Sequence, residues 1–234
     1  MREIINGERE IISTPQSIYD AFNSFIFSSD IRVMTKLIAK VVLFEKIKDI
    51  PGDIVECGVF KGSGVLGWLK IKRILSYNSF KKIIGFDFFN TEQLIKSLDG
   101  DDMEKMEALF ETRNFSHNID FRDILEKKIM SYGFDLSEFE LIAGDIKDTA
   151  FDFVSQRPGF KISLLYLDLD LNIPTYNALF NLWDRVSRGG IVAFDEYAYH
   201  QWSETSGADR FFEDKKITIK SLDFSAPTAY IIKP

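Results

Sequence analysis

Two acidic segments in the second half of the chain each lie at the end of an apolar run. The first, "YLDLDLNIPTY", contains Asp168 and Asp170, and the second, "GGIVAFDEY", contains Asp195 and Glu196. If the two runs form neighbouring parallel strands, their carboxyl ends bring these carboxylates to one edge of a sheet. Two like charges about 5 Å apart repel by roughly 3 kcal/mol at an effective dielectric constant of 20. The acids therefore require protons, basic partners or a cation in order to coexist.

Carboxylate oxygens on short, rigid segments are ligands that Mg²⁺ prefers, with Mn²⁺ and Ca²⁺ as alternatives. Neither acidic segment contains cysteine or histidine, so a structural zinc site is not expected. The residues alone also allow a second interpretation without a metal. In that interpretation Asp168 caps a strand end, Asp170 is solvated, and Asp195 and Glu196 accept hydrogen bonds from backbone amides.

A glycine-rich segment, "ECGVFKGSGVLGWL", follows an earlier apolar run. Gly58, Gly62 and Gly64 fall at the predicted strand-to-helix turn, where the backbone must closely approach a ligand or the next helix. A helix beginning near Ser63 would direct its first amides into the crevice beyond the sheet. The spacing G-x-x-x-G-x-G differs from the dinucleotide fingerprint, which argues against NAD and FAD. The glycines are not followed by a Lys-Ser/Thr pair either, which argues against a nucleotide triphosphatase.

Further candidate binding residues lie at or near strand ends. Asp87 ends the run "IIGFDFF" at a position where acids accept hydrogen bonds from ribose hydroxyls. Asp145 ends "LIAGDI" and could face an adenine amino group, although either acid could instead cap the next helix. Glu56 either binds a ligand or fixes the glycine loop through backbone amides. Cys57 is more typical of a small packing residue than of a nucleophile, because no histidine lies near it in the sequence.

The elements that must position these residues alternate along the chain. Short β-branched runs alternate with segments of helical period, which predicts an α/β fold with a doubly wound, mostly parallel sheet of seven strands. The first five predicted strands are nearly continuous apolar runs, as burial on both faces requires. They span 53–59, 82–88, 139–145, 161–168 and 190–196. Two last runs, 216–222 and 228–234, predict an antiparallel pair that closes the sheet.

Capping signals predict the main helices. We expect helices over 28–50, from Ser63 onward, over 120–133, and over 174–190, where Pro174 falls in the first turn and a glycine pair ends the helix. Residues 1–50 are expected to form a helical extension that covers the ligand crevice, followed by one domain over 51–234. A long insertion near 90–134 is either an exposed helical excursion or a lid over the site.

Composition limits the class of protein. The chain has 234 residues, 45% of them hydrophobic and 28% charged, which is ordinary for a folded globular chain. The net charge of −7 argues against a nucleic-acid partner. The single cysteine, Cys57, suits a reducing compartment. The N-terminal segment is too charged for a secretory signal and the apolar runs are too short to span a bilayer, so we expect a cytoplasmic protein with no membrane partner.

Several of these segments together resemble the macrocin O-methyltransferase (TylF-like) family. They are "IPGDIVECGVFKGSG", "GFDFF" and "LDLDLNIPTYNALFNLWDRVSRGGIVAFDEY", with the "W…G…F" that follows. The resemblance covers roughly residues 29–212. It implies a Rossmann-like class I methyltransferase that uses S-adenosylmethionine, generally with Mg²⁺, to methylate sugar hydroxyls of glycosylated small molecules. It also implies a homo-oligomer.

The resemblance carries roles onto residues of this chain. It implies that Asp168, Asp195 and Glu196 hold the metal and that Asp170 is the general base. The implied cofactor-binding residues are Glu56, Cys57, Gly58, Val59, Gly62, Ser63, Gly64, Asp87, Phe88, Asp145, Ile146 and Asp168. The family's D-D-Y is here Asp195-Glu196-Tyr197, which lengthens one ligand by a methylene. Leu169 and Asn172 replace a glycine and a tyrosine of the family motif, which alters the acceptor side.

An aromatic segment, "EYAYHQWSETSG", follows the second acidic pair. Tyr197, Tyr199 and Trp202 offer ring faces on which a sugar can stack, although Trp202 could equally pack under the following helix. His200 is an alternative catalytic base. The leading hypothesis is therefore a sugar O-methyltransferase. The alternatives are an NAD(P)-type Rossmann oxidoreductase and a non-catalytic sugar- or nucleotide-binding relative.

Overall fold

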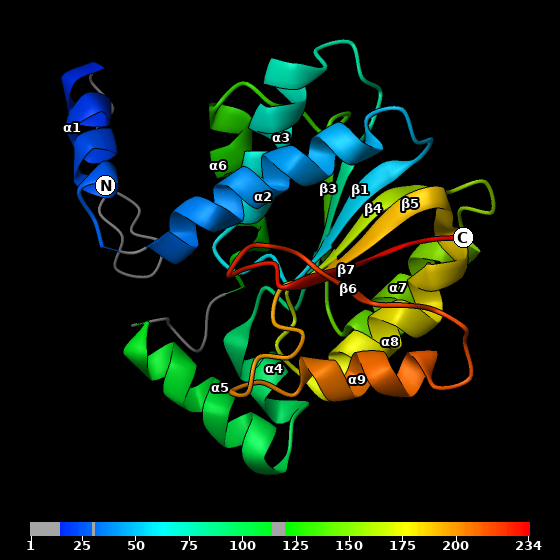
Figure 1. The fold of residues 1–234 in the computed structure, drawn as a ribbon. Helices are drawn as coiled ribbons and strands as arrows, with labels where there is room; N and C mark the ends of the chain where they lie inside the picture. Colours follow the sequence, from blue (N-terminus) through cyan, green and yellow to red (C-terminus); the bar gives the residue numbers. More distant parts are fainter. Residues whose placement is uncertain (1–14, 30, 114–119) are drawn as a thin grey trace.

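A single seven-stranded sheet organises the computed structural model, which describes residues 15–29, 31–113 and 120–234 (Figure 1). The strand order is β3-β2-β1-β4-β5-β7-β6. The strands are β1 (Asp53–Cys57), β2 (Ile83–Asp87), β3 (Phe139–Ala143), β4 (Ile162–Leu167), β5 (Val186–Phe194), β6 (Lys220–Ser221) and β7 (Ala229–Ile232). β1 to β5 are parallel, while β7 is antiparallel to both β5 and β6. The predicted fold class is confirmed.

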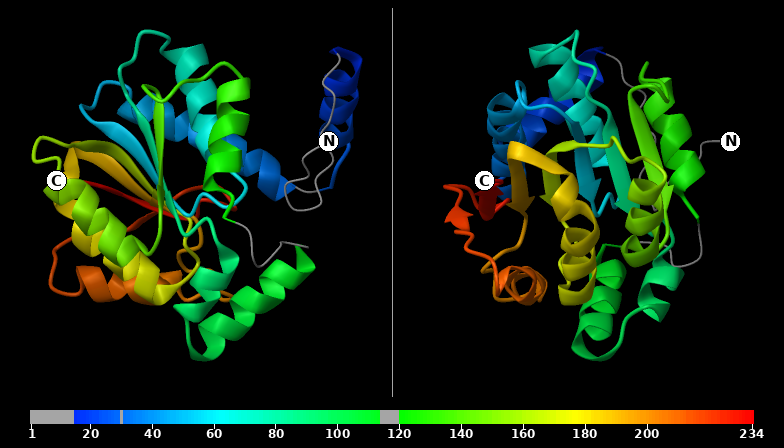
Figure 2. Two further views of the ribbon diagram at one scale, coloured as in Figure 1. Left: turned by 180° about the vertical axis from the view of Figure 1, so that it is seen from behind. Right: turned by 90° about the vertical axis from the view of Figure 1, so that its right-hand side faces the viewer.

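Helices cover both faces of the sheet (Figure 2). The helices of the described residues are α1 (Pro15–Ile26), α2 (Ile31–Ile47), α3 (Ser63–Leu75), α4 (Thr91–Lys96), α5 (Gly100–Thr112), α6 (Arg122–Ser131), α7 (Ile146–Ser155), α8 (Asn172–Leu182) and α9 (Glu204–Phe212), of which α1 stands apart from the sheet. The predicted extension over 1–50 and the insertion over 90–134 each lie partly outside the described residues, at 1–14, 30 and 114–119. Among the described helices, none combines the length and apolarity needed to cross a bilayer.

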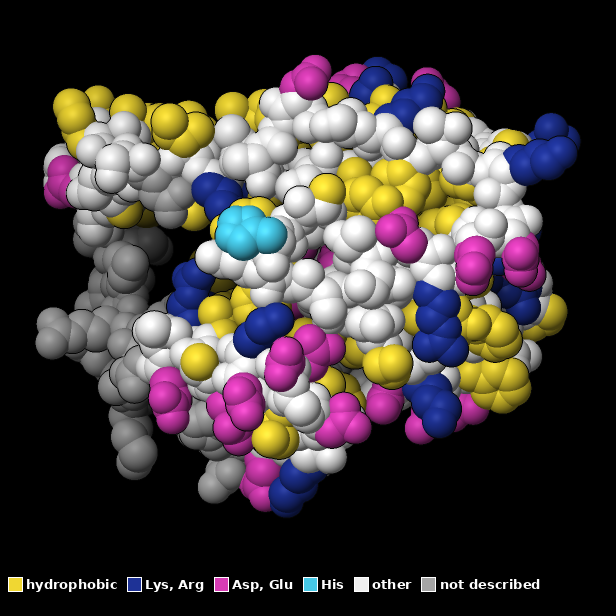
Figure 3. All heavy atoms as spheres, turned by 60° about the horizontal axis from the view of Figure 1, so that its bottom comes forward, with side chains coloured by type: hydrophobic (Ala, Val, Ile, Leu, Met, Phe, Trp, Pro, Cys, Tyr) yellow, Lys and Arg dark blue, Asp and Glu magenta, His cyan; other side chains and the backbone are white. Residues whose placement is uncertain are grey.

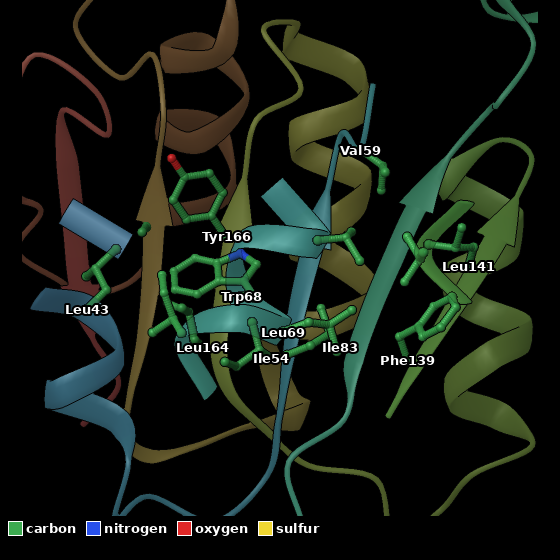
Figure 4. Packing of buried hydrophobic residues seen from close by; sticks show 14 of the residues in the cluster. Leu43, Ile54, Val59, Trp68, Leu69, Ile83, Phe139, Leu141, Leu164 and Tyr166 are labelled. Carbon is green, nitrogen blue, oxygen red and sulfur yellow. The ribbon is translucent and has the colours of Figure 1, made fainter. Parts of the chain in front are cut away.

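Two apolar layers hold the helices to the sheet. On one face Trp68, Leu43 and Tyr166 pack with residues of β1, β2 and β4 (Figure 4). On the other face, Leu165 and Phe194 pack with side chains of α7, α8 and α9. Successive strand residues alternate between these layers, so the strands are apolar on both sides. Each fully buried large apolar side chain contributes about 1.5–3 kcal/mol, and these layers therefore fix the sheet that carries the site.

Two predicted boundaries are wrong. The helix predicted over 174–190 ends at Leu182, and a short 3₁₀ turn leads directly into β5 at Val186. The strand can start there because Val186 pairs with Ile162 of β4, and a register shift then absorbs the glycine pair. The strand predicted over 216–222 is reduced to two residues. Ile217 packs as an apolar side chain at the edge of the core but lies outside the strand.

The register of the central strands places the acidic segments together. Leu167 of β4 is paired with Phe194 of β5, so the next residues, Asp168 and Asp195, leave the sheet side by side. The amide of Asp195 donates to the carbonyl of Leu167 over 2.9 Å, and the amide of Asp168 donates to the carbonyl of Cys57 over 2.9 Å. The predicted convergence of the acids depended on β4 and β5 being neighbouring strands, and they are neighbours.

Candidate active site

A cavity of about 740 Å³ opens beyond the carboxyl ends of β1, β2 and β4. The glycine loop and α2 contribute to its wall, and α4 and α5 contribute Leu94, Met106 and Phe110. Seen from the end where α4 and α5 lie, acidic side chains gather over α5 on the outside of the molecule (Figure 3). The insertion after β2 therefore presents apolar side chains to the cavity and acidic ones to solvent.

The glycine loop lies unusually close to its neighbours. Gly58 has φ +92°, and a Cβ added there would lie 1.8 Å from the carbonyl oxygen of Asp168. A Cβ added at Gly64 would lie 1.9 Å from Oε1 of Glu56. Real Cβ atoms do not approach other atoms so closely, so neither position accepts a side chain without movement of its surroundings. These two glycines allow the loop and the start of α3 to seat against β4 and Glu56.

Asp87 connects the glycine loop to the end of β2. Its Oδ2 accepts hydrogen bonds from the amides of Val59 and Phe60 over 2.8 and 2.9 Å, and its Oδ1 accepts one from Phe89 over 2.9 Å. Burial raises the pKa of this carboxyl, and the backbone amides counteract part of that effect. Asp87 also lines the cavity, so it both fixes the loop and contributes to the cavity wall.

The sequence candidates for cofactor binding divide into two groups. Those on the cavity wall are Glu56, Gly58, Val59, Ser63, Gly64, Asp87, Phe88, Ile146 and Asp168. The other three lie outside this lining. Cys57 is fully buried on the opposite face, and burial raises the pKa of its thiol. Gly62 turns against Leu125, and Asp145 caps α7 by accepting the amide of Lys147 over 2.8 Å.

Three carboxylates of the acid edge, by which we mean Asp168, Asp170, Asp195 and Glu196, are paired with basic side chains of α2. Nζ of Lys36 lies 2.8 Å from Oδ2 of Asp168 and 2.9 Å from Oδ2 of Asp195. Glu196 is paired with the guanidinium of Arg32. Basic partners are therefore the solution found for Asp168, Asp195 and Glu196 among the described residues.

Electrostatics at the acid edge differ from group to group. Burial lowers the pKa of Lys36, but Asp168 and Asp195 outweigh burial and raise that pKa above its usual value. Lys36 is therefore a permanent cation. Burial, followed by the charge of Asp168, raises the pKa of Asp195 to about 7. Burial together with Asp168, Glu196 and Asp195 raises the pKa of Asp170 well above its usual value.

The expected divalent ion does not fit this arrangement. Two of its three expected ligands, Asp168 and Asp195, share the Lys36 ammonium, and the third, Glu196, is held by Arg32. A Mg²⁺ ion sits about 2.0–2.1 Å from its oxygen ligands, so it cannot share the position between these two aspartates with an ammonium. Across residues 15–29, 31–113 and 120–234, no three potential ligand side chains are arranged to hold a metal. Metal ligation by these acids stays a prediction.

Sequence reasoning missed the basic residues of α2. Arg32, Lys36 and Lys40 recur every four residues and so share one face of the helix. Nζ of Lys40 lies 2.9 Å from Oε1 of Glu56 and over the rings of Trp68 and Tyr166, at 4.2 and 3.9 Å from their centroids. The spacing was visible in the sequence, but its partners are distant acids that only the fold identifies.

A fifth carboxyl, Glu204, was also missed. It is fully buried, and its Oε1 accepts the amide of Glu196 over 2.9 Å. Burial raises its pKa well above the usual value, which favours the protonated form of this carboxyl. The amides of Ser203 and Glu204 both donate to the carbonyl of Asp170 over 3.0 Å. The loop after β5 therefore holds Asp170, whose φ is +62°.

The two candidate bases have different surroundings. Asp170 lines the cavity beside Leu169 and Trp202. His200 is exposed and lies outside the cavity lining, with its ring tilted against that of Tyr199 at a centroid distance of 5.1 Å. Position therefore favours Asp170 over His200 as the group that meets a bound acceptor.

The sheet order with β7 antiparallel beside β5, the glycine loop after β1 and the acid ending β2 define a class I methyltransferase fold. The family model described as Macrocin-O-methyltransferase (TylF) matches residues 29–228. The chain belongs to this family, and the resemblance seen in the sequence is confirmed.

Individual relatives agree with this assignment. The chain is 28% identical over 152 residues to the 8-demethyl-8-(2,3-dimethoxy-alpha-L-rhamnosyl)-tetracenomycin-C 4'-O-methyltransferase of Streptomyces olivaceus; the match covers 64% of the chain and 54% of that protein. The chain thus spans about half the length of this curated relative. The apo structure of CalS11, a TDP-rhamnose 3'-O-methyltransferase, superposes with a TM-score of 0.67 at 22% identity, covering 95% of this chain and 87% of CalS11. The O-methyltransferase NovP gives 0.68 at 20% identity, covering 85% and 79%. These two structures share the fold.

Proposed function

We propose that the protein is an S-adenosylmethionine-dependent O-methyltransferase that methylates a hydroxyl of a sugar or of a glycosylated small molecule. The observation that carries the proposal is a single cavity whose wall includes both the glycine loop with Asp87 and the acid edge with Asp170. A donor and an acceptor bound there would lie beside each other. Membership of the macrocin O-methyltransferase family supports the same reaction.

The donor side is assigned to the glycine loop and the end of β2. The start of α3 at Ser63 directs free amides into the cavity, where they favour a carboxylate. Asp87 is assigned to the ribose hydroxyls, since its position at the end of β2 suits that task. Lys40 holds Glu56 against the loop over 2.9 Å. The donor therefore meets a wall that is already formed.

The proposed reaction is an in-line methyl transfer. S-adenosylmethionine, when bound, supplies an electrophilic methyl group: the methyl–sulfur bond breaks as the methyl–oxygen bond forms, and the sulfonium becomes a neutral thioether. Asp170 accepts the hydroxyl proton, a role that typically contributes about 10²–10⁴-fold. Its raised pKa makes the carboxylate a stronger proton acceptor than an ordinary aspartate. Lys36 occupies the space between Asp168 and Asp195, so the proposed reaction does not include the magnesium assistance expected from the family.

The acceptor is assigned to the side of the cavity formed by Leu169, Trp202 and α5. An aromatic face beside polar groups suits a sugar ring, and the relative from Streptomyces olivaceus is named for methylation of a rhamnosyl compound. We place the reaction in the cytoplasm, since the only cysteine is buried and unpaired. We further propose a homo-oligomer, without nucleic-acid or membrane partners.

Isothermal titration with S-adenosylhomocysteine tests the donor assignment. We expect binding in the micromolar range and a one-to-one ratio per chain. A screen of rhamnose-bearing acceptors, read by mass spectrometry, should then detect the gain of one methyl group. Binding of NADH in place of S-adenosylhomocysteine would instead support the oxidoreductase alternative, and binding without turnover on any acceptor would support a non-catalytic relative.

A further inference from the structure

The positive charge at the acid edge comes from outside the sheet. Lys36 belongs to α2, which precedes β1, yet its ammonium lies between carboxylates that follow β4 and β5. It contacts one oxygen of each aspartate, at 2.8 and 2.9 Å. The remaining oxygen of Asp195 accepts the hydroxyl of Tyr166 over 2.5 Å. Oδ1 of this carboxylate is therefore hydrogen-bonded, and its Oδ2 has the ammonium as an ion-pair partner but accepts no hydrogen bond from the described residues.

Glu196, the third acid of the expected metal-binding set, also has a basic partner, although its Oε2 is buried without a hydrogen bond from the part of the chain that the structure describes. Arg32, one helical turn before Lys36, pairs with Glu196. Lys40, one turn after Lys36, is anchored by Glu56 and by the rings of Trp68 and Tyr166. The contacts of Lys40 fix the position of α2 relative to the cavity. The position of the Lys36 ammonium thus follows from contacts on both sides of it.

We propose that the Lys36 ammonium takes the place of the divalent cation at the acid edge, so that this chain holds Asp168 and Asp195 in their working positions without a resident metal. The inference rests on the proposed function and concerns how the same site is organised. It departs from the magnesium dependence that the sequence predicts by resemblance.

The arrangement gives Lys36 a positioning role and leaves it a donor for the acceptor. An ammonium has three N–H donors; one donates to Asp168 over 2.8 Å, and Asp195 is an ion-pair partner at 2.9 Å. Lys36 lines the cavity, so a remaining N–H can donate to the acceptor oxygen. Negative charge develops on that oxygen as Asp170 removes the proton, and a fixed cation stabilises it.

Electron paramagnetic resonance with Mn²⁺ tests the inference without an acceptor. Mn²⁺ is added to the full chain saturated with S-adenosylhomocysteine, and the signal of free Mn²⁺ is followed. We expect the wild-type protein to leave that signal unchanged. Lys36→Met keeps the apolar stem but removes the charge, so it should create a site between the two aspartates. The affinity for Mn²⁺ should rise by about 100-fold or more, because a unit charge about 4 Å from the ion is lost.

Two further variants accompany this measurement. Lys46→Met is the matched control, since Lys46 is exposed in the last turn of the same helix; it should behave as the wild type does. Lys36→Arg keeps the charge and should not bind Mn²⁺. Tight Mn²⁺ binding by the wild type would overturn the inference, as would a folded Lys36→Met protein with no gain in affinity. If Lys36→Met does not fold, the wild type alone decides.

The same samples separate this inference from the proposed function. S-adenosylhomocysteine titrated into the wild-type protein and into Lys36→Met reports the donor site independently of the metal. If the wild-type protein does not bind S-adenosylhomocysteine, the proposed function is contradicted. Retained binding combined with a wild-type Mn²⁺ site would contradict only the role of Lys36.

Discussion

Asp170 is the residue on which the proposed chemistry most directly depends. Its backbone has φ +62°, a conformation that few non-glycine residues adopt, and two amides of the loop after β5 hold its carbonyl. Strained backbone of this kind is retained where the surrounding structure determines it, often at functional sites. The strain therefore agrees with a carboxylate aimed into the cavity.

Replacing Asp170 with asparagine should leave the shape of the site and remove its base. We expect turnover to fall by about 10²–10⁴-fold, the usual contribution of a general base. The dissociation constant of S-adenosylhomocysteine should stay nearly unchanged, because the donor side is formed by other residues. Initial rates and isothermal titration measure the two effects. Asp214→Asn, at an exposed position, is the control, and near-full activity of Asp170→Asn would remove this residue as the base.

Glu204 makes a prediction about stability and pH. Its pKa is raised in the folded protein above the usual 4.5, so the folded state binds its proton more tightly than the unfolded state does. The stabilisation from this group is complete below pH 4.5 and declines as the pH rises toward the folded-state pKa. Glu204→Gln keeps the acceptor for the amide of Glu196 and removes the titration. The variant should therefore gain stability relative to the wild type as the pH increases.

Urea denaturation at pH 5.5 and pH 8 measures this difference. The gap in unfolding free energy between Glu204→Gln and the wild type should be wider at pH 8. An equal gap at both values would mean that Glu204 is already ionised in the folded protein.

At the scale of elements, the turn from β1 into α3 depends on contacts too close for side chains. Gly64→Ala would place a methyl group 1.9 Å from Oε1 of Glu56, so α3 or Glu56 must move. Overpacking of this kind costs about 1–3 kcal/mol of folding stability, and displacement of the glycine loop should weaken S-adenosylhomocysteine binding as well. Gly67→Ala in the same helix meets only Lys40 Cδ at 4.0 Å, and it should be as stable as the wild type or more so. Thermal denaturation and titration of both variants check the contrast.

Most elements could be predicted from the sequence because the residues that determine each one lie within it or directly beside it. β1, β2 and β4 are apolar on both sides, and α6 ends beside Gly133, whose φ is +81°. The start of β5 could not be predicted this way. Its first residues, "VSRGG", carry the polar and glycine content of a helix end, and only the pairing of Val186 with Ile162 makes them a strand.

The site shows the same division at the scale of the whole molecule. The convergence of Asp168 and Asp195 follows from strand order, which alternation of strands and helices makes predictable. Lys36 lies more than a hundred residues earlier, on a helix whose charges resemble an ordinary solvated face. Only the packing of α2 across the sheet brings its ammonium to the two aspartates. The sequence predicted that the clustered acids need protons, basic partners or a cation. It did not identify Lys36 as the basic partner.

The N-terminal helix offers a prediction about assembly. α1 stands away from the sheet in both orientations (Figures 1 and 2), and none of the residues described in it is buried. Ile18, Phe22 and Ile26 recur every four residues and remain 57%, 57% and 45% exposed, while Asp20 is the only charged residue of the helix. An exposed apolar stripe with so little charge marks a surface for association. In the proposed homo-oligomer, this stripe contacts a second copy of the chain.

Substituting Ile18 and Phe22 with aspartate should dissociate the oligomer. Two charges on the stripe would face like charges on the second copy and would lose the apolar area that drives association. Sedimentation velocity should show the wild type above the mass of one chain, 27.0 kDa, and the double variant at that mass. Asn23→Asp adds one charge to α1 outside the stripe and serves as the control. A wild-type protein that sediments as a monomer at high concentration would leave the stripe without this partner, whereas a double variant that stays oligomeric would place the interface elsewhere on the molecule.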